Sequence, residues 1–236
     1  GLNCHPAVKN KTVNKYSCFT PETIIKIKDA FNKGHPNEQI VDKNPKKIWG
    51  ILRKKLKNCN NETCWLQEIK EEEDVKSLQK YFSPKHPKEW NKNPNEWLSN
   101  EDILLVLKQY EETYPNFEFI GPTMIDFDTK ISDITCVENR LCNFSLYDMV
   151  QKGKHKIGII FNLDKHTQNG SHWVSLFIDI DEKIIFYFDS VGNTIPSEIN
   201  TFKEKVIKQG SQLNPPIYFK YDKNTEQHQK GNTECG

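Results

Sequence analysis

Residues 172–189 read HWVSLFIDIDEKIIFYFD, and this stretch decides the fold of the C-terminal part of the chain. Its apolar residues lie on both sides of a polar pair, Asp181-Glu182, which predicts two strands joined by a short turn. Such a turn makes the strands an antiparallel hairpin, although the glycine that hairpin turns prefer is absent. Because His172 and Asp189 are nearly equidistant from the turn, the pairing brings them within hydrogen-bonding reach.

Two residues near the C-terminal end complete a set of catalytic groups, since Gln229 precedes Cys235 by six residues. A histidine can deprotonate a thiol, an aspartate can orient the imidazole, and a glutamine can donate a hydrogen bond to a developing oxyanion. Each residue alone has a more ordinary explanation. A free cysteine, for example, is most often a small buried hydrophobe. The combination predicts a cysteine protease that needs no cofactor and no metal, with these catalytic residues: His172, Asp189, Cys235 and Gln229.

The rest of the chain predicts an α+β protein with a helical N-terminal domain. Residues 83–96 contain three prolines and three asparagines, so we expect a linker there and place the domains at 1–90 and 91–236. Capping residues and apolar spacing predict helices at 20–34, 44–56, 62–70, 74–82, 99–110 and 197–209. Besides the hairpin, strands are expected at 117–120, 157–163 and 217–221.

Composition and charge limit the classes of function. The seven cysteines are irregularly spaced, which argues against a secreted disulfide framework and predicts reduced thiols. No apolar run reaches the roughly 18 residues that span a membrane. The net charge is +1, but residues 1–90 carry 18 Lys and Arg against 11 Asp and Glu, a net charge of +7. The densest basic cluster, Arg53-Lys54-Lys55, is either a solvated helix face or a contact site for nucleic acid.

The order of the motifs resembles that of a known peptidase family. The pairs His172-Trp173 and Asp189-Ser190, followed by Gln229 and Cys235-Gly236, are similar to the motifs of SUMO proteases and adenovirus proteases. The resemblance implies a papain-like or adenain-like core, in which a mixed, mainly antiparallel sheet is flanked by helices. It also implies that the cysteine begins a helix. Because Gly236 is the last residue of the sequence, we expect further C-terminal helices beyond it.

Two tryptophans suggest the class of substrate. In SUMO proteases two indoles flank the Gly-Gly tail of the substrate, and Trp97 and Trp173 match those positions, with core packing as the alternative role. Two indole faces closing on a peptide backbone leave room for glycine but not for a Cβ. We therefore expect a polypeptide substrate with small residues at the cleaved bond.

The whole chain is similar to the maturation proteases of large cytoplasmic DNA viruses, such as the protease of African swine fever virus. The similarity rests on Ser17-Cys18-Phe19, Cys64-Trp65-Leu66, Asn95-Glu96-Trp97-Leu98, Gly121-Pro122, Ile125-Asp126-Phe127 and Gly170-Ser171-His172-Trp173. It implies a cysteine endopeptidase that cleaves viral structural polyproteins after Gly-Gly-Xaa motifs during virion maturation. The expected location is the viral assembly site in the host cytoplasm and the virion.

Three other functions remain open at this point. A SUMO or ubiquitin-like-specific isopeptidase acting on host conjugates would use the same catalytic residues. An acetyltransferase of the same fold is less consistent with the sequence, because that group generally has glutamate at the position of Asp189. A non-catalytic binding module is less consistent too, since all the catalytic residue types are present.

Overall fold

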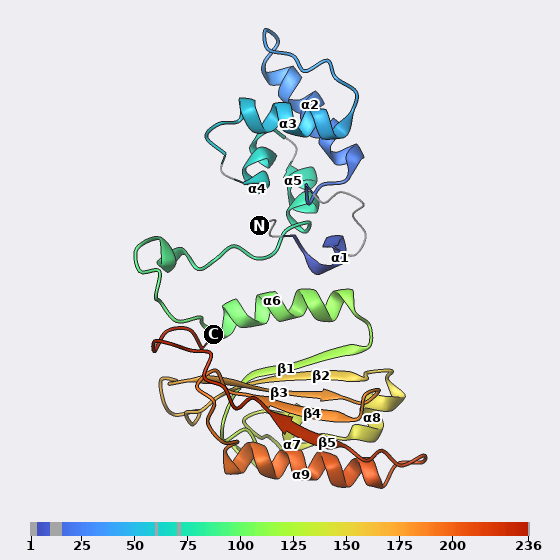
Figure 1. The fold of residues 1–236 in the computed structure, drawn as a ribbon, viewed down its shortest axis with the longest axis vertical. Helices are drawn as coiled ribbons and strands as arrows, with labels where there is room; N and C mark the ends of the chain where they lie inside the picture. Colours follow the sequence, from blue (N-terminus) through green and yellow to red (C-terminus); the bar gives the residue numbers. More distant parts are fainter. Residues whose placement is uncertain (1–3, 10–15, 60, 70–71, 236) are drawn as a thin grey trace. The chain divides into compact units, whose positions relative to one another are not determined.

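The computed structural model of the protein describes residues 4–9, 16–59, 61–69 and 72–235 (Figure 1). The chain divides into two compact units, residues 1–84 and 85–236, and the division falls inside the proline-rich segment 83–96. Each unit has a hydrophobic cluster of its own. The four residues predicted to be catalytic, His172, Asp189, Gln229 and Cys235, all lie in the second unit.

Short helices build the first unit. They are α1 (Pro6–Lys9), α2 (Pro21–Gly34), α3 (Pro45–Lys55), α4 (Glu62–Trp65) and α5 (Glu72–Gln79), with a 3₁₀ turn at Leu66–Glu68. The predicted start of α2 is confirmed, because the side chain of Thr20 accepts a hydrogen bond from the N–H of Thr23 and Pro21 follows the cap. The buried faces of these helices surround Trp65.

The helix expected at 62–70 is wrong in its length. It is divided into α4 and the 3₁₀ turn, and Ile69 already has an extended backbone. Trp65, Leu66 and Ile69 are all buried, so the apolar side chains that suggested a helix do enter the core, although the helical backbone ends before Ile69. Lys70, the last residue of the expected helix, lies outside the described residues.

Three disulfides correct the expectation of reduced thiols. The disulfides join Cys4 to Cys18, Cys59 to Cys64 and Cys136 to Cys142. The paired cysteines are 14, 5 and 6 residues apart, so short local loops bring the sulfurs together. Because these separations follow no regular pattern, the sequence does not predict the pairs. Cys235 remains a free thiol.

A five-stranded sheet with the order β1-β2-β3-β4-β5 forms the centre of the second unit. The strands are β1 (Phe117–Met124), β2 (Lys156–Asn162), β3 (Trp173–Asp179), β4 (Ile184–Phe188) and β5 (Lys220–Lys223). The sheet is mixed, as predicted, but it is not mainly antiparallel, because β1–β2 and β4–β5 are parallel pairs. Parallel neighbours require a crossover. Helices α7 (Asn139–Cys142) and α8 (Leu146–Gln151) lie in one crossover and α9 (Ser197–Ser211) lies in the other.

The hairpin of β3 and β4 is confirmed in the predicted register. Ser175 pairs with Phe188, which centres the hairpin on the turn expected from the sequence. Lys183 takes the left-handed conformation, with φ of 56°, that glycine more often supplies in such turns. Strand β3 begins directly after His172 and β4 ends directly before Asp189, so the hairpin carries both residues to the same end of the sheet.

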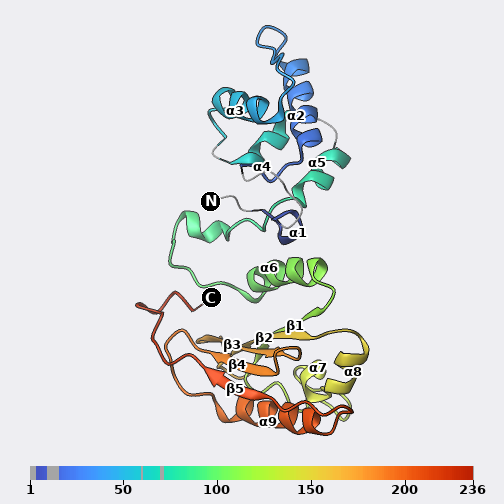
Figure 2. The same ribbon diagram turned by 45° about the vertical axis from the view of Figure 1, so that its right-hand side comes forward.

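Helices cover both faces of the sheet (Figures 1 and 2). Helix α6 (Asn100–Thr113) packs on one face, where Ile103 contacts a cluster that contains Phe119 and Trp173. Helix α9 packs on the other face through buried residues that include Phe202. The predicted capping box at the start of α6 is confirmed, with Ser99 as its cap. Among the described residues, no helix combines the length and the apolar character needed to span a lipid bilayer.

Candidate active site

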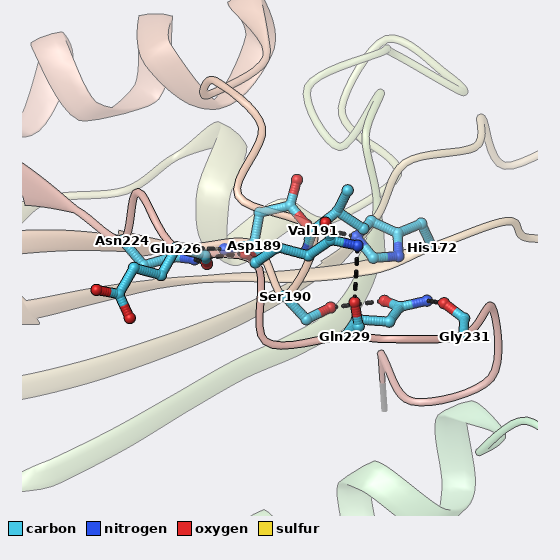
Figure 3. A network of polar contacts seen from close by, with 9 residues as sticks. His172, Asp189, Ser190, Val191, Asn224, Glu226, Gln229 and Gly231 are labelled. Carbon is cyan, nitrogen blue, oxygen red and sulfur yellow. Dashed lines mark hydrogen bonds and ion pairs between the residues drawn. The ribbon is translucent and has the colours of Figure 1, made fainter.

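His172 and Asp189 form the centre of the site. The Nε2 atom of His172 lies 2.6 Å from Oδ1 of Asp189, whose side chain has no solvent exposure. The same Oδ1 atom also accepts a hydrogen bond of 2.9 Å from the N–H of Val191. Because Nε2 donates to the carboxylate, Nδ1 is the nitrogen of the imidazole that remains for proton transfer with a thiol. The sequence-predicted pair is thus brought into direct contact (Figure 3).

The loop that leads into His172 is held by side chains at its own base. The Oδ1 atom of Asn162, at the end of β2, accepts hydrogen bonds from the N–H groups of Asp164 and Ser171. The carboxylate of Asp164 accepts bonds from the N–H of Gly170 and from the hydroxyl of Ser171, at 3.0 and 2.7 Å. The carbonyl of His172 accepts a bond from the N–H of Leu163. The backbone that carries the imidazole is therefore fixed from both sides.

A second anchor holds the tip of this loop. Asp126 accepts a hydrogen bond of 2.7 Å from Nδ1 of His166 and one of 2.9 Å from its backbone N–H. Burial raises the pKa of Asp126, but the hydrogen bonds and the charge of His166 outweigh it and hold the pKa below its ordinary value. The loop is thus anchored to the segment after β1 by an ionised carboxylate.

Gln229 is buried, and hydrogen bonds hold both its side chain and its backbone. Its Oε1 atom accepts a bond of 2.8 Å from the hydroxyl of Ser190, and its Nε2 atom donates a bond of 2.7 Å to the carbonyl of Gly231. Its backbone N–H donates to the carbonyl of Ser190. Because an amide Nε2 carries two hydrogens, one N–H remains for an oxyanion.

Cys235 packs in the hydrophobic cluster between α6 and the sheet. Its side chain is partly buried and packs against the group that contains Trp173 and Leu98. Among the described residues, no hydrogen bond joins its sulfur to His172 or Gln229. Contacts between catalytic groups are often loose before a substrate binds. The structure therefore brings the histidine and aspartate together and leaves the thiol in the same unit without a direct bond to them.

Hydrogen bonds within the loop before Cys235 hold its conformation. The carboxylate of Glu234 accepts hydrogen bonds of 3.1 and 2.6 Å from the N–H groups of Lys230 and Gly231. Because Gly231 is also the acceptor for the side chain of Gln229, the same turn links the predicted oxyanion donor to the residue next to the thiol. A carboxylate at position 234 therefore has a structural use in closing this turn.

The two tryptophans of the predicted substrate cleft differ in their exposure. Trp173, at the start of β3, is 8% exposed, and its Nε1 donates a hydrogen bond of 3.3 Å to the carbonyl of Leu98. Trp97, the residue before Leu98, is 42% exposed. The bond to Leu98 ties the segment of Trp97 to the strand that carries Trp173. Trp173 is thus packed into the core, while Trp97 is partly open to solvent, and contact of either indole with a substrate stays a prediction.

Sequence reasoning did not single out Asn224. Its side chain bonds to the backbone of Asp189 through both of its polar atoms, at 2.9 and 2.6 Å. The only signal in the sequence is an asparagine three residues after the strand expected at 217–221, and asparagine is an ordinary turn residue. The contact joins residues 35 positions apart in the sequence, so no local sequence pattern predicts it.

The C-terminal part of the chain is similar to a known protease family. Residues 151–236 match the model of the Ulp1 protease family, C-terminal catalytic domain. A protein of Acanthamoeba polyphaga mimivirus, named as a candidate thiol protease, is 37% identical over 142 residues, which cover 60% of this chain. The SUMO-1 cysteine protease of African swine fever virus is 25% identical over 204 residues, covering 81% of this chain and 74% of that protein. This chain spans only 44% of the length of the mimivirus protein.

The fold has a counterpart among solved structures. The crystal structure of the African swine fever virus protease superposes with a TM-score of 0.61 at 21% sequence identity. The superposition covers 99% of this chain and 81% of that protein, so the α/β architecture is shared. The segment that matches the Ulp1 protease family model, residues 151–236, contains His172 and Asp189, whose side chains are in contact.

Proposed function

We propose that this chain is a cysteine endopeptidase that cleaves viral structural polyproteins after Gly-Gly-Xaa motifs during virion maturation. The observation that carries the proposal is the hydrogen bond of 2.6 Å between His172 and the fully buried Asp189, in the unit that also contains Gln229 and Cys235. Two similar proteins, from mimivirus and African swine fever virus, are named as proteases that use a thiol, which supports a viral role.

In the first half of the reaction, Cys235 gives its thiol proton to Nδ1 of His172. The thiolate attacks the carbonyl carbon of the peptide bond, and the electron pair of the carbonyl moves to its oxygen. The free N–H of Gln229 donates a hydrogen bond to this oxyanion. The imidazolium of His172 then protonates the leaving nitrogen, the C–N bond breaks, and a thioester to Cys235 remains. Asp189 stabilises the imidazolium through Nε2 during these steps.

In the second half, water hydrolyses the thioester. His172 takes a proton from the water molecule through Nδ1, and the resulting hydroxide attacks the thioester carbon. The C–S bond breaks, the proton returns to the sulfur of Cys235, and the carboxylic acid product leaves. The residues of this chain supply the base, the acid, the nucleophile and the oxyanion donor.

The substrate class follows from the two indoles. An exposed Trp97 and a buried Trp173, tied together through Leu98, support a narrow slot for the substrate backbone. Glycine is the residue that such a slot admits most readily, because it lacks a Cβ. A backbone held in this way presents its carbonyl to the thiolate in a defined orientation.

Peptides that contain Gly-Gly-Xaa test this proposal. We expect the wild-type protein to cleave after the second glycine, as seen by mass spectrometry, and Cys235→Ala to leave the same peptide intact. Peptides with alanine in place of the second glycine serve as the matched substrate control, and we expect little cleavage of them. Equal cleavage by the wild type and by Cys235→Ala would refute the nucleophile.

A SUMO or ubiquitin-like-specific isopeptidase is the second candidate. The observation in its favour is that the similar African swine fever virus protein is named a SUMO-1 cysteine protease. A SUMO conjugate and a Gly-Gly-Xaa peptide compared in one assay separate the two functions. Faster turnover of the conjugate, lost in Cys235→Ala, would move the assignment to the isopeptidase.

We also propose that residues 1–90 act as a helical arm domain that contacts nucleic acid or an acidic partner. Of the basic cluster on α3, Lys55 pairs with Glu38 at 2.8 Å and Arg53 lies over the ring of Trp49, so Lys54 is the side chain with no partner among the described residues. Binding of duplex DNA at low and high salt, with Lys54→Glu as the variant, tests this contact. A DNA affinity that changes neither with salt concentration nor with the Lys54→Glu substitution would contradict the proposed nucleic-acid contact.

The location in the cell is a proposal of the same kind. We place the protein at assembly sites in the host cytoplasm and in the virion. Disulfides are rare in the reducing cytosol, so the three pairs favour the virion as the place where this oxidised form persists. Thiol trapping of infected cells and of purified virions distinguishes the two populations.

A further inference from the structure

We propose that Asn224 is a positioning residue of the active site, which holds the backbone of Asp189 so that its carboxylate meets His172. The inference rests on the proposed protease function. Three hydrogen bonds of the Asn224 side chain support the inference. The Oδ1 atom of Asn224 accepts the N–H of Asp189 at 2.9 Å, and its Nδ2 atom donates to the carbonyls of Asp189 at 2.6 Å and of Glu226 at 3.0 Å. Figure 3 shows Asn224 and His172 on opposite sides of Asp189.

The sheet itself does not hold Asp189. The last pair between β3 and β4 is Ser175 with Phe188, and the last pair between β4 and β5 is Tyr187 with Lys223. Asp189 therefore lies one residue beyond the strand ladder. The side-chain amide of Asn224 presents one acceptor and one donor to its backbone, as a neighbouring strand would. Asn224 extends the ladder by one residue at the position where the catalytic carboxylate begins.

This placement matters because the carboxylate has little tolerance for movement. Its Oδ1 atom serves both Nε2 of His172, at 2.6 Å, and the N–H of Val191, at 2.9 Å. A backbone shift at Asp189 changes both bonds together, and misplacement by about 1 Å can cost on the order of 100-fold in rate. We expect the loss of Asn224 to act through the imidazole, which would be held less firmly and stabilised less as imidazolium.

The same side chain also fixes the beginning of the loop that carries Gln229. Its bond to the carbonyl of Glu226 turns the chain after β5, and the backbone N–H groups of His228 and Gln229 then reach the carbonyl of Ser190. Asn224 thus joins the two halves of the site, the aspartate at the end of β4 and the oxyanion donor after β5.

The test compares Asn224→Ala with Asn193→Ala, an exposed asparagine in the loop that follows Asp189. One readout is kcat and KM on a Gly-Gly-Xaa peptide. The other is the pH dependence of Cys235 alkylation by iodoacetamide, which needs no substrate and reports the thiolate–imidazolium pair. We expect Asn224→Ala to lower kcat by about 10- to 100-fold with little change in KM, by the magnitude of misplacement above. We expect its low-pH alkylation limb to move to higher pH.

The outcomes separate the two claims. A wild type that neither cleaves the peptide nor shows a low-pH thiolate would overturn the proposed function and this inference with it. A competent wild type with an unchanged alkylation profile in Asn224→Ala would overturn the positioning role alone, even if stability had fallen. If the alanine variant does not fold, as judged by circular dichroism, Asn224→Gln carries the same test, because it keeps the amide and displaces it by one methylene.

Discussion

At the scale of single residues, Ser190 and Gly231 together orient the side-chain amide of Gln229. The hydroxyl of Ser190 donates to Oε1 at 2.8 Å, and both residues are buried. The carbonyl of Gly231 can only accept, so the amide nitrogen faces it and the oxygen is left for the hydroxyl of Ser190. The amide is therefore oriented before any substrate arrives, which is the condition for electrostatic stabilisation without reorganisation.

Replacing Ser190 by alanine removes this orientation without removing the oxyanion donor. Deletion of an oxyanion donor typically costs 10²- to 10³-fold in kcat, so we expect a smaller fall, of about 10-fold, in Ser190→Ala. Steady-state kinetics on a Gly-Gly-Xaa peptide measures the effect, with the exposed Ser211→Ala as the control. An effect confined to KM would mean that Ser190 contacts the substrate rather than orienting Gln229.

The contrast between His172 and Asn224 shows which site residues a sequence can reveal. His172 meets Asp189, 17 positions further on, through a hairpin with one short turn, so register arithmetic alone predicts the contact. Asn224 reaches the same aspartate across 35 residues that include α9 and a parallel strand pairing. Contacts made through a crossover depend on packing of the whole unit, and no periodicity encodes them.

At the scale of elements, the loop between β2 and β3 depends on the ionised state of Asp126. The folded-state pKa of this carboxyl lies below its ordinary value of 3.8. Its contribution to stability is therefore fully present above about pH 4 and is lost as the pH falls below its unfolded pKa toward the folded one.

Asp126→Asn tests this dependence. We expect the variant to unfold at a lower Tm than the wild type at pH 7, by the equivalent of about 2 kcal/mol for a charge-assisted hydrogen bond. The difference in Tm should shrink below about pH 4, because the wild-type carboxyl is then protonated too. Thermal unfolding followed by circular dichroism at pH 7, 5 and 3 gives the comparison, with the exposed Asp128→Asn as the control. A difference that is constant with pH would contradict the role of the charge.

The start of α6 gives a second prediction at this scale. Ser99 and Asp102 form a reciprocal capping box, and the helix begins directly after the segment of Trp97. Ser99→Ala removes one half of the box, so we expect a loss of about 1 kcal/mol in the free energy of unfolding. Chemical denaturation measures it, and Ser132→Ala, an exposed loop serine, is the control. If α6 also orders Trp97, KM for a Gly-Gly-Xaa peptide should rise in the same variant.

Strand β5 shows why element boundaries were harder to predict than element types. The strand was expected at 217–221, where apolar residues begin, but it forms at Lys220–Lys223. The N–H of Ile217 is already used by the carbonyl of Gly210 at the end of α9, so this residue closes a turn before the ladder starts. Tyr221 provides the apolar side chain that packs on the core from β5.

At the scale of the whole molecule, the cysteines fall into two classes that a thiol assay can count. Six are paired and Cys235 is free, and all seven lie in the described part of the chain. Ellman titration of the unfolded, unreduced protein should therefore give one thiol per chain, and titration after reduction should give seven. Cys235→Ala lowers each count by one. Three or more thiols per chain before reduction would mean that at least one of the pairs is reduced, as the cysteine spacing in the sequence predicts.

The order of pairings in the sheet has a consequence for how the protein acquires activity as it folds. The β3–β4 hairpin is a local contact, so His172 and Asp189 can meet early. Strand β5 reaches β4 only after the crossover through α9, and the loop with Gln229 and Cys235 follows it. Non-local parallel pairing is slow because loop-closure entropy is lost before the contact forms. A nascent chain would therefore bring His172 and Asp189 near each other before Asn224, Gln229 and Cys235 arrive, and the proposed site would be complete only when β5 has paired with β4.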